Sequence, residues 1–139
     1  MIVVNTNVIS ELMRAEPHGR LLNWFERQPI AGLFTTTLTQ AEIFYGLAFL
    51  PDGHRQEALV SAARAMFDQD FAGRILPFDV DAAQVYPEIA AGRRQRGQPI
   101  SQFDAQMAAI VRSRGARLAT RNTKDFADCG ITVVDPWAE

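Results

Sequence analysis

The chain has 139 residues, of which 47% are hydrophobic and 22% charged, and these proportions predict one compact domain over residues 1–139. A formal net charge of −2 excludes a uniformly basic surface, so only local arginine clusters could attract nucleic acid. The single cysteine excludes an intramolecular disulfide and a thiolate zinc cluster. No apolar run approaches the roughly 20 residues of a membrane span, and the N-terminus lacks signal-peptide features, so we expect a cytoplasmic protein with no membrane association.

The first half of the chain predicts two strands and four helices. Residues 2–4 are a β-branched run typical of a buried strand, and Asn5-Thr6-Asn7 supplies the turn and cap residues that end it. Helices are then expected at 8–13, 21–25, 39–50 and 57–71, with a second strand at 33–37. Pro29 ends the second of these helices, and Pro51-Asp52-Gly53 separates the last two.

The second half predicts three further strands and two helices. Strands are expected at 74–78, 117–120 and 131–134, and helices at 81–96 and 101–114, which end at Gly97 and Gly115. Since strands alternate with helices throughout, the fold class is α/β, with a parallel sheet covered by helices on both faces. In such sheets a functional site lies beyond the carboxyl ends of the strands.

Polar side chains gather where the predicted strands end. They comprise Asn5, Thr6 and Asn7 after the first strand, Thr36, Thr37, Thr39 and Glu42 after the second, and Thr120, Asn122 and Asp125 after the fourth. Asp104 opens the helix that leads into the fourth strand. Because the carboxyl ends of parallel strands meet at one edge of a sheet, we expect these groups to converge there.

Helix capping is the simpler interpretation of the acids in this set. Three motifs match or resemble a capping box, namely Thr39-x-x-Glu42, Ser101-x-x-Asp104 and Asn122-x-x-Asp125. Two observations favour a functional site instead. The helices that carry Glu42 and Asp104 are largely apolar, so both carboxylates are expected to be partly buried, and neither has a basic neighbour in the sequence to neutralise it.

A divalent cation would satisfy such carboxylates. Mg²⁺ and Mn²⁺ prefer oxygen ligands and are commonly held by one or two carboxylates together with water and substrate phosphate. A metal ion of this kind lowers the pKa of bound water and stabilises charge on a phosphoryl group. Carboxylates with hydroxyl groups beside them therefore indicate phosphodiester hydrolysis.

Four segments resemble the motifs of PIN domains, in order and at the usual spacing. They are residues 3–11 (VVNTNVISE), beside the family's hhDTNVISE; residues 39–46 (TQAEIFYG), beside T..E...G; residues 103–110 (FDAQMAAI), beside DA.IAA.A; and residues 118–126 (LATRNTKDF), beside laTrN..DF. The closing Asp135-Pro136-Trp137 also fits the branch of VapC, FitB and plasmid-stability proteins. The chain thus resembles a PIN-domain ribonuclease toxin of the VapC type.

The resemblance implies a three-layer α/β/α domain with a parallel sheet of four to five strands. It implies the toxin of a type II toxin–antitoxin system, an endoribonuclease that depends on Mg²⁺, or on Mn²⁺, to hydrolyse RNA phosphodiester bonds. The implied partners are the RNA substrate, a cognate VapB-like antitoxin, operator DNA reached only through that antitoxin, and a second copy of the chain in a homodimer.

The resemblance also implies the site residues. The catalytic set is Asn5, Glu42, Asp104, Asp125, Asn122, Thr6 and Thr120, and the metal ligands are Asn5, Glu42, Asp104 and Asp125. Either Asp125 or Asn122 takes the fourth position, and we favour Asp125 as the acid, with Asn122 organising water or backbone. Thr6 and Thr120 would orient metal-bound water or phosphate, unless their hydroxyls only cap a helix or a turn.

Position 5 departs from the family pattern, because it carries Asn where the family has a catalytic Asp. An amide keeps an acceptor oxygen but has no negative charge. At an effective dielectric near 20, the missing charge reduces the attraction for a cation a few Å away by on the order of several kcal/mol. We therefore expect weak or absent cleavage, and the alternative function is a nuclease-dead module that binds antitoxin, and RNA, without cleaving.

Apolar residues of the predicted helices either line a groove for an antitoxin helix or form ordinary core. These residues are Leu21, Leu22, Trp24, Phe25, Phe44, Phe49, Leu50, Met66 and Phe67. A phosphotransferase of the haloacid-dehalogenase type is disfavoured, because it needs a nucleophilic Asp after its first strand and Asn5-Thr6-Asn7 supplies none.

Overall fold

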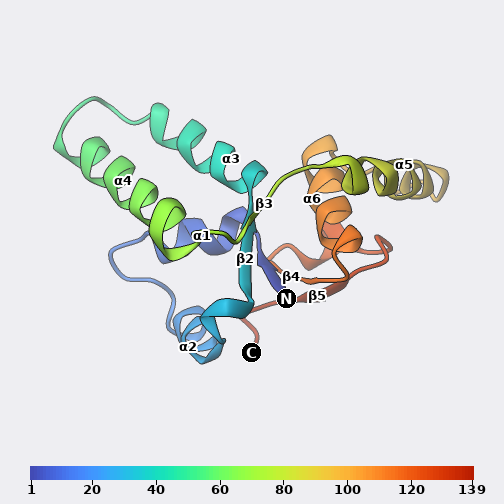
Figure 1. Cartoon of the computed structure of the whole chain (residues 1–139), viewed down its shortest axis with the longest axis horizontal. Helices are drawn as coiled ribbons and strands as arrows, with labels where there is room; N and C mark the ends of the chain where they lie inside the picture. Colours follow the sequence, from blue (N-terminus) through green and yellow to red (C-terminus); the bar gives the residue numbers. More distant parts are fainter.

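The computed structural model describes residues 1–139 and contains a five-stranded sheet (Figure 1). The strands are β1 (Ile2–Val4), β2 (Leu33–Thr36), β3 (Ile75–Leu76), β4 (Arg117–Ala119) and β5 (Thr132–Val134). They lie in the order β3-β2-β1-β4-β5, and every neighbouring pair is parallel. The predicted α/β class and parallel sheet are confirmed.

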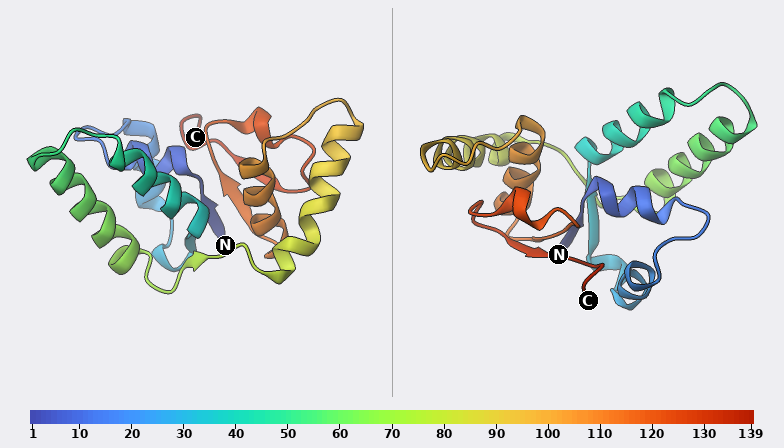
Figure 2. Two further views of the ribbon diagram at one scale, coloured as in Figure 1. Left: turned by 90° about the horizontal axis from the view of Figure 1, so that it is seen from above. Right: turned by 180° about the vertical axis from the view of Figure 1, so that it is seen from behind.

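Helices cover both faces of this sheet (Figure 2). One layer contains α5 (Val80–Gln95) and α6 (Gln102–Ser113), and the other contains α1 (Thr6–Leu12), α2 (Gly19–Arg27), α3 (Thr37–Ala48) and α4 (His54–Ala65). Because side chains alternate along a strand, Val3 packs into the core of the first layer, whereas Ile2 and Val4 pack into the core of the second. The expected three-layer α/β/α architecture is therefore confirmed.

The strand order reverses between β1 and β4. The chain first adds β2 and β3 on one side of β1, and later adds β4 and β5 on the other side. In open parallel sheets, ligands bind in the crevice outside the carboxyl ends of the strands at such a reversal. Asn5 follows β1 and Thr120 follows β4, so both lie at the position where this fold places functional sites.

The two helices that follow β1 and β2 each begin two residues earlier than the sequence predicts. α1 begins at Thr6 rather than at residue 8, because the Asn5 side chain caps it by accepting a hydrogen bond from the Thr6 amide (2.8 Å). α3 begins at Thr37, because the Thr36 hydroxyl accepts a hydrogen bond from the Thr39 amide (3.0 Å). The predicted capping box at Thr39 is therefore wrong, and the Thr39 hydroxyl is free to bind elsewhere.

The bounds of α4 differ from the prediction, whereas α5 and α6 end at the predicted glycines. The helix predicted over residues 57–71 starts at His54 as α4 and continues from Met66 as a short π-helical segment, η2 (Met66–Asp70). Gly97 (φ 72°) and Gly115 (φ 61°) adopt the left-handed backbone after α5 and α6, as predicted. None of the helices combines the length and the apolar character that crossing a membrane requires.

Candidate functional site

The side chains that follow β1 and β4 meet at one buried hydroxyl group. The Thr120 hydroxyl oxygen accepts hydrogen bonds from the Asn5 side-chain amide (3.1 Å), the Asn7 side-chain amide (3.0 Å) and the Asn122 backbone amide (3.2 Å). Thr120 is fully buried and Asn5 is 5% exposed. Asn5 and Thr120 are 115 positions apart in the sequence, so only the parallel sheet brings them together.

Both polar atoms of the Asn5 side-chain amide form hydrogen bonds within the protein. Its Oδ1 accepts a hydrogen bond from the Thr6 amide, and its Nδ2 donates one to the Thr120 hydroxyl. A carboxylate at position 5 would keep the first bond but could not donate the second, so the Thr120 hydroxyl would have to become the donor. Residue 5 therefore sets both the charge and the direction of hydrogen bonding at the centre of the site.

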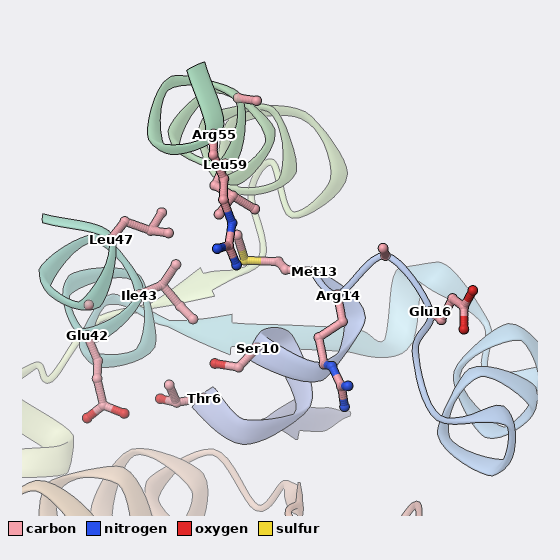
Figure 3. A pocket seen from close by; sticks show the side chains of 13 residues that line it. Thr6, Ser10, Met13, Arg14, Glu16, Glu42, Ile43, Leu47, Arg55 and Leu59 are labelled. Atoms are coloured by element: carbon pink, nitrogen blue, oxygen red, sulfur yellow. The ribbon is translucent and has the colours of Figure 1, made fainter. Parts of the chain in front are cut away.

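Thr6 connects this network to α3. The hydroxyl oxygens of Thr6 and Thr39 lie 3.1 Å apart and share a hydrogen bond. Glu42 follows one turn later on α3 and points its carboxylate toward Thr6 (Figure 3). Glu42 is exposed and forms no ion pair, so the expectation that it is partly buried is wrong. α3 turns this residue toward an open groove rather than toward the core.

Asp104 and Asp125 are the acids at the other end of the site. Asp104 is half-buried in the first turn of α6, where its backbone amide binds the Ser101 hydroxyl (3.1 Å), so this predicted cap is present. The pKa of Asp104 is raised above its ordinary value, and burial is the largest cause. A hydrogen bond with Ser101 and the charge of Arg93 oppose this rise, whereas the negative charge of Asp125 adds to it. Asp125 is exposed in η3 (Thr123–Phe126), which packs against α6. Neither acid forms an ion pair with a basic side chain.

A side-chain contact connects the end of β2 to α6, the helix that carries Asp104. The Thr36 hydroxyl, at the end of β2, donates to the sulfur of Met107 (3.9 Å), and Met107 lies one turn after Asp104 on α6. Hydrogen bonds join Asn5, Thr6, Thr120 and Asn122, whereas Asp104 and Asp125 interact through their charges. Glu42 forms no hydrogen bond with any of them.

A metal ion at this edge would have to be held by oxygen atoms. No three His, Cys, Asp or Glu side chains gather into a metal-binding group. Asp104 and Asp125 are the nearby carboxylates, and the Asn5 oxygen already accepts a hydrogen bond and carries no charge. Because Mg²⁺ keeps several waters and needs only one or two carboxylates, the oxygen donors fit a hydrated divalent ion that is weakly held.

An open groove of about 920 Å³ lies beside Glu42 and Thr6, between α1, α3 and α4 (Figure 3). An adjoining hollow of about 380 Å³ extends from it to Arg121 and Trp137. The groove has an apolar wall and a charged rim, formed by Met13, Ile43, Leu47 and Leu59 and by Arg14, Glu16, Glu42 and Arg55.

This groove is not lined by the apolar residues that the sequence suggested. Leu21, Trp24 and Phe67 are buried core instead, and of the whole set only Phe49 is exposed. α2 and η2 pack these side chains against the sheet, so they serve the core rather than a partner.

Residues 2–130 match the model of the PIN domain. The chain belongs to the PIN-domain family. VapC ribonuclease Y4jK of Sinorhizobium fredii is 38% identical to it over 137 residues, 99% of this chain and 98% of the relative. Toxin FitB of Neisseria gonorrhoeae is 33% identical over 99% of each chain. A solved structure of FitAB bound to an IR36 DNA fragment superposes with a TM-score of 0.93 at 33% identity, over 99% of this chain and 96% of that chain.

Two polar residues of this PIN domain's candidate site are absent from the predicted catalytic set. Asn7 donates to Thr120 in the same manner as Asn5. Arg93, which lies in one of the arginine clusters of the sequence, is only 7% exposed and interacts with Asp104 through its charge. The burial of Arg93 could have been predicted from helical spacing, because Arg93 shares one face of α5 with the buried Ala82 and Ile89.

Replacing Thr120 with Val is expected to lower the free energy of unfolding of the PIN domain by about 1–3 kcal/mol. Valine removes the oxygen that accepts from Asn5, Asn7 and Asn122, and the buried Asn5 donor then lacks a partner. Urea unfolding followed by circular dichroism measures the change. Thr123→Val, at an exposed position, is the control and should shift stability by no more than about 0.5 kcal/mol. Equal stability of Thr120→Val and the parent chain would contradict this role of the hydroxyl.

Proposed function

We propose that this chain is the toxin of a type II toxin–antitoxin system and a Mg²⁺- or Mn²⁺-dependent endoribonuclease whose activity Asn5 impairs. One observation carries the proposal. Oxygen-bearing side chains from distant segments meet at the reversal of strand order, and Asp104 and Asp125 add negative charge beside them. Relatives named as a VapC ribonuclease and as a toxin support it.

In this proposal the negative charge of the site holds the metal ion. Asp104, Asp125 and residue 5 would hold the ion directly, and Glu42, which does not gather with the two aspartates, would contact it only through bound water. The bound ion supplies a more acidic water and offsets charge on the phosphate. Thr6 and Thr120 orient water or phosphate through their hydroxyls. Asn122 organises the backbone at Asp125, because its carbonyl accepts a hydrogen bond from the Asp125 amide (3.1 Å).

We infer that the partner is a VapB-like antitoxin and that operator DNA is reached through it. The related FitAB structure is bound to a DNA fragment. The groove between α1, α3 and α4 suits an antitoxin segment, because its apolar wall fits apolar side chains and Arg14, Arg55 and Glu42 offer charged contacts at its rim. The proposed state is a cytoplasmic homodimer.

Metal dependence tests the nuclease proposal. The Asn5→Asp form is incubated with a structured RNA in Mg²⁺, in Mn²⁺ or in EDTA, and the products are mapped on a sequencing gel. We expect internal cuts with either metal and intact RNA in EDTA. Cleavage that survives EDTA, or intact RNA under every condition, would refute the proposal.

The second candidate function is a nuclease-dead PIN domain that binds antitoxin, and RNA, without cleaving. Asn5 favours it, since the amide is neutral and both of its ends bind inside the protein. Titration calorimetry with Mn²⁺ separates the two functions. An impaired nuclease binds the ion weakly, and Asn5→Asp strengthens that binding. A dead module gives no heat of binding in either form.

A further inference from the structure

Arg93 is a buried cation without an acidic partner in direct contact. It lies near the end of α5, is 7% exposed and forms no ion pair. Its guanidinium stays charged when buried, so its N–H groups need acceptors. They donate to the carbonyl oxygens of Gln98 (2.7 Å), Asp125 (2.9 Å) and Ala127 (2.9 Å), and one lies 3.6 Å from the Cys129 sulfur.

These acceptors belong mainly to residues 125–129, the segment that carries Asp125. The segment has little regular structure of its own, since η3 ends at Phe126 and Asp128 adopts the left-handed backbone (φ 59°). Phe126 and Cys129 anchor it through buried side chains. Arg93 supplies the buried polar anchor from α5, 32 positions before Asp125 and 34 before Ala127. The Arg96 side chain adds one longer, exposed hydrogen bond to the Asp128 carbonyl (3.4 Å).

The anchor opposes a repulsion. The negative charge of Asp125 disfavours ionisation of Asp104, because like charges repel. The exposed Asp125 would relax away from Asp104 unless the backbone that carries it is held in place. The planar guanidinium of Arg93 can bind several carbonyl oxygens at once, which a lysine ammonium in the same place would do less well.

We propose that Arg93 is a positioning residue of the nuclease site, which clamps the backbone of residues 125–129 to α5 and so holds Asp125 beside Asp104. The inference deepens the proposed function and rests on it for the effect on cleavage. The clamp itself rests only on the hydrogen bonds of Arg93. Its neighbour Arg94 is exposed and makes none of these contacts.

Backbone hydrogen exchange tests the clamp without any assumption about activity. Arg93→Met keeps the apolar stem, Arg93→Lys keeps the charge, and Arg94→Met is the matched control. We expect about tenfold faster exchange of the amides of residues 125–129 in Arg93→Met, with β1 and α6 unchanged, and no local change in Arg94→Met. Should Arg93→Met fail to fold, Arg93→Lys carries the test, with about threefold faster exchange in the same segment. Unchanged exchange in the segment, or an equal increase throughout the chain, would overturn the inference.

Cleavage by the same variants in the Asn5→Asp background tests the positioning role. Displacing a site residue by about 1 Å can cost about 10²-fold, so we expect kcat to fall by about that factor in Arg93→Met with KM for RNA little changed. Arg93→Lys should not restore kcat, because it lacks the planar fork. Full rescue by Lys would show that only charge matters and would overturn the clamp. If Asn5→Asp itself does not cleave RNA, the proposed function fails, and the exchange experiment still decides whether Arg93 clamps the segment.

Discussion

Restoring a carboxylate at position 5 is expected to raise the rate of RNA cleavage by about 10²–10³-fold. Two unit charges about 4 Å apart attract by about 4 kcal/mol at an effective dielectric near 20. Each 1.4 kcal/mol of extra stabilisation corresponds to about a tenfold change. Asn5→Asp also leaves the Thr120 hydroxyl with a carboxylate to donate to, which fixes that side chain toward the site. The measurement is initial cleavage rate in Mg²⁺ for the parent chain and for Asn5→Asp.

Asn7→Asp is the matched control for this result. Asn7 also donates to Thr120, so the substitution adds the same charge nearby but not at position 5. It should give no comparable gain. Because residue 5 is buried, Asn5→Asp should also melt at a lower temperature than the parent in EDTA and recover when Mn²⁺ is added. Equal and negligible cleavage by Asn5→Asp and the parent chain would count against the role given to this position.

Replacing Asp104 with Asn should strongly reduce cleavage and stabilise the fold at the same time. In the Asn5→Asp background we expect the cleavage rate to fall by about 10²-fold or more, since a second charge is lost from the proposed metal site. Burial raises the pKa of Asp104 above its ordinary value, so the folded chain binds this proton more tightly than the unfolded chain does. The stability that Asp104 contributes is therefore present at low pH and is lost as pH rises through the raised pKa.

The stabilising effect has a defined pH window. At pH 7, Asp104→Asn should raise the melting temperature by about 1–3 °C, because the neutral amide avoids the cost of a half-buried charge. Below pH 3.8, the ordinary value for aspartate, the two forms should melt alike. Asp81→Asn, an exposed acid in the first turn of α5, is the control and should neither raise the melting temperature nor reduce cleavage. A lower melting temperature for Asp104→Asn at neutral pH would show that its charge is better compensated than we propose.

Local patterns of the sequence were enough to predict the elements and their order. The β-branched run at Ile2–Val4, the glycines that end α5 and α6, and the regular alternation of strands with helices each report on the backbone within a few residues. The parallel sheet follows from that alternation, and with it the convergence of polar residues at one edge. The PIN motifs added the identity of the candidate acids, including the departure at Asn5.

Tertiary structure alone decided how those residues are used. The sequence could not pair Asn5 with Thr120, place the Arg93 guanidinium against the backbone of Asp125, or show that Glu42 faces an open groove rather than the core. Each of these outcomes depends on which faces of distant elements meet, and burial or exposure of a polar side chain is settled only by that packing. A periodic pattern gives the face a residue occupies, but the partner on that face comes from elsewhere in the chain.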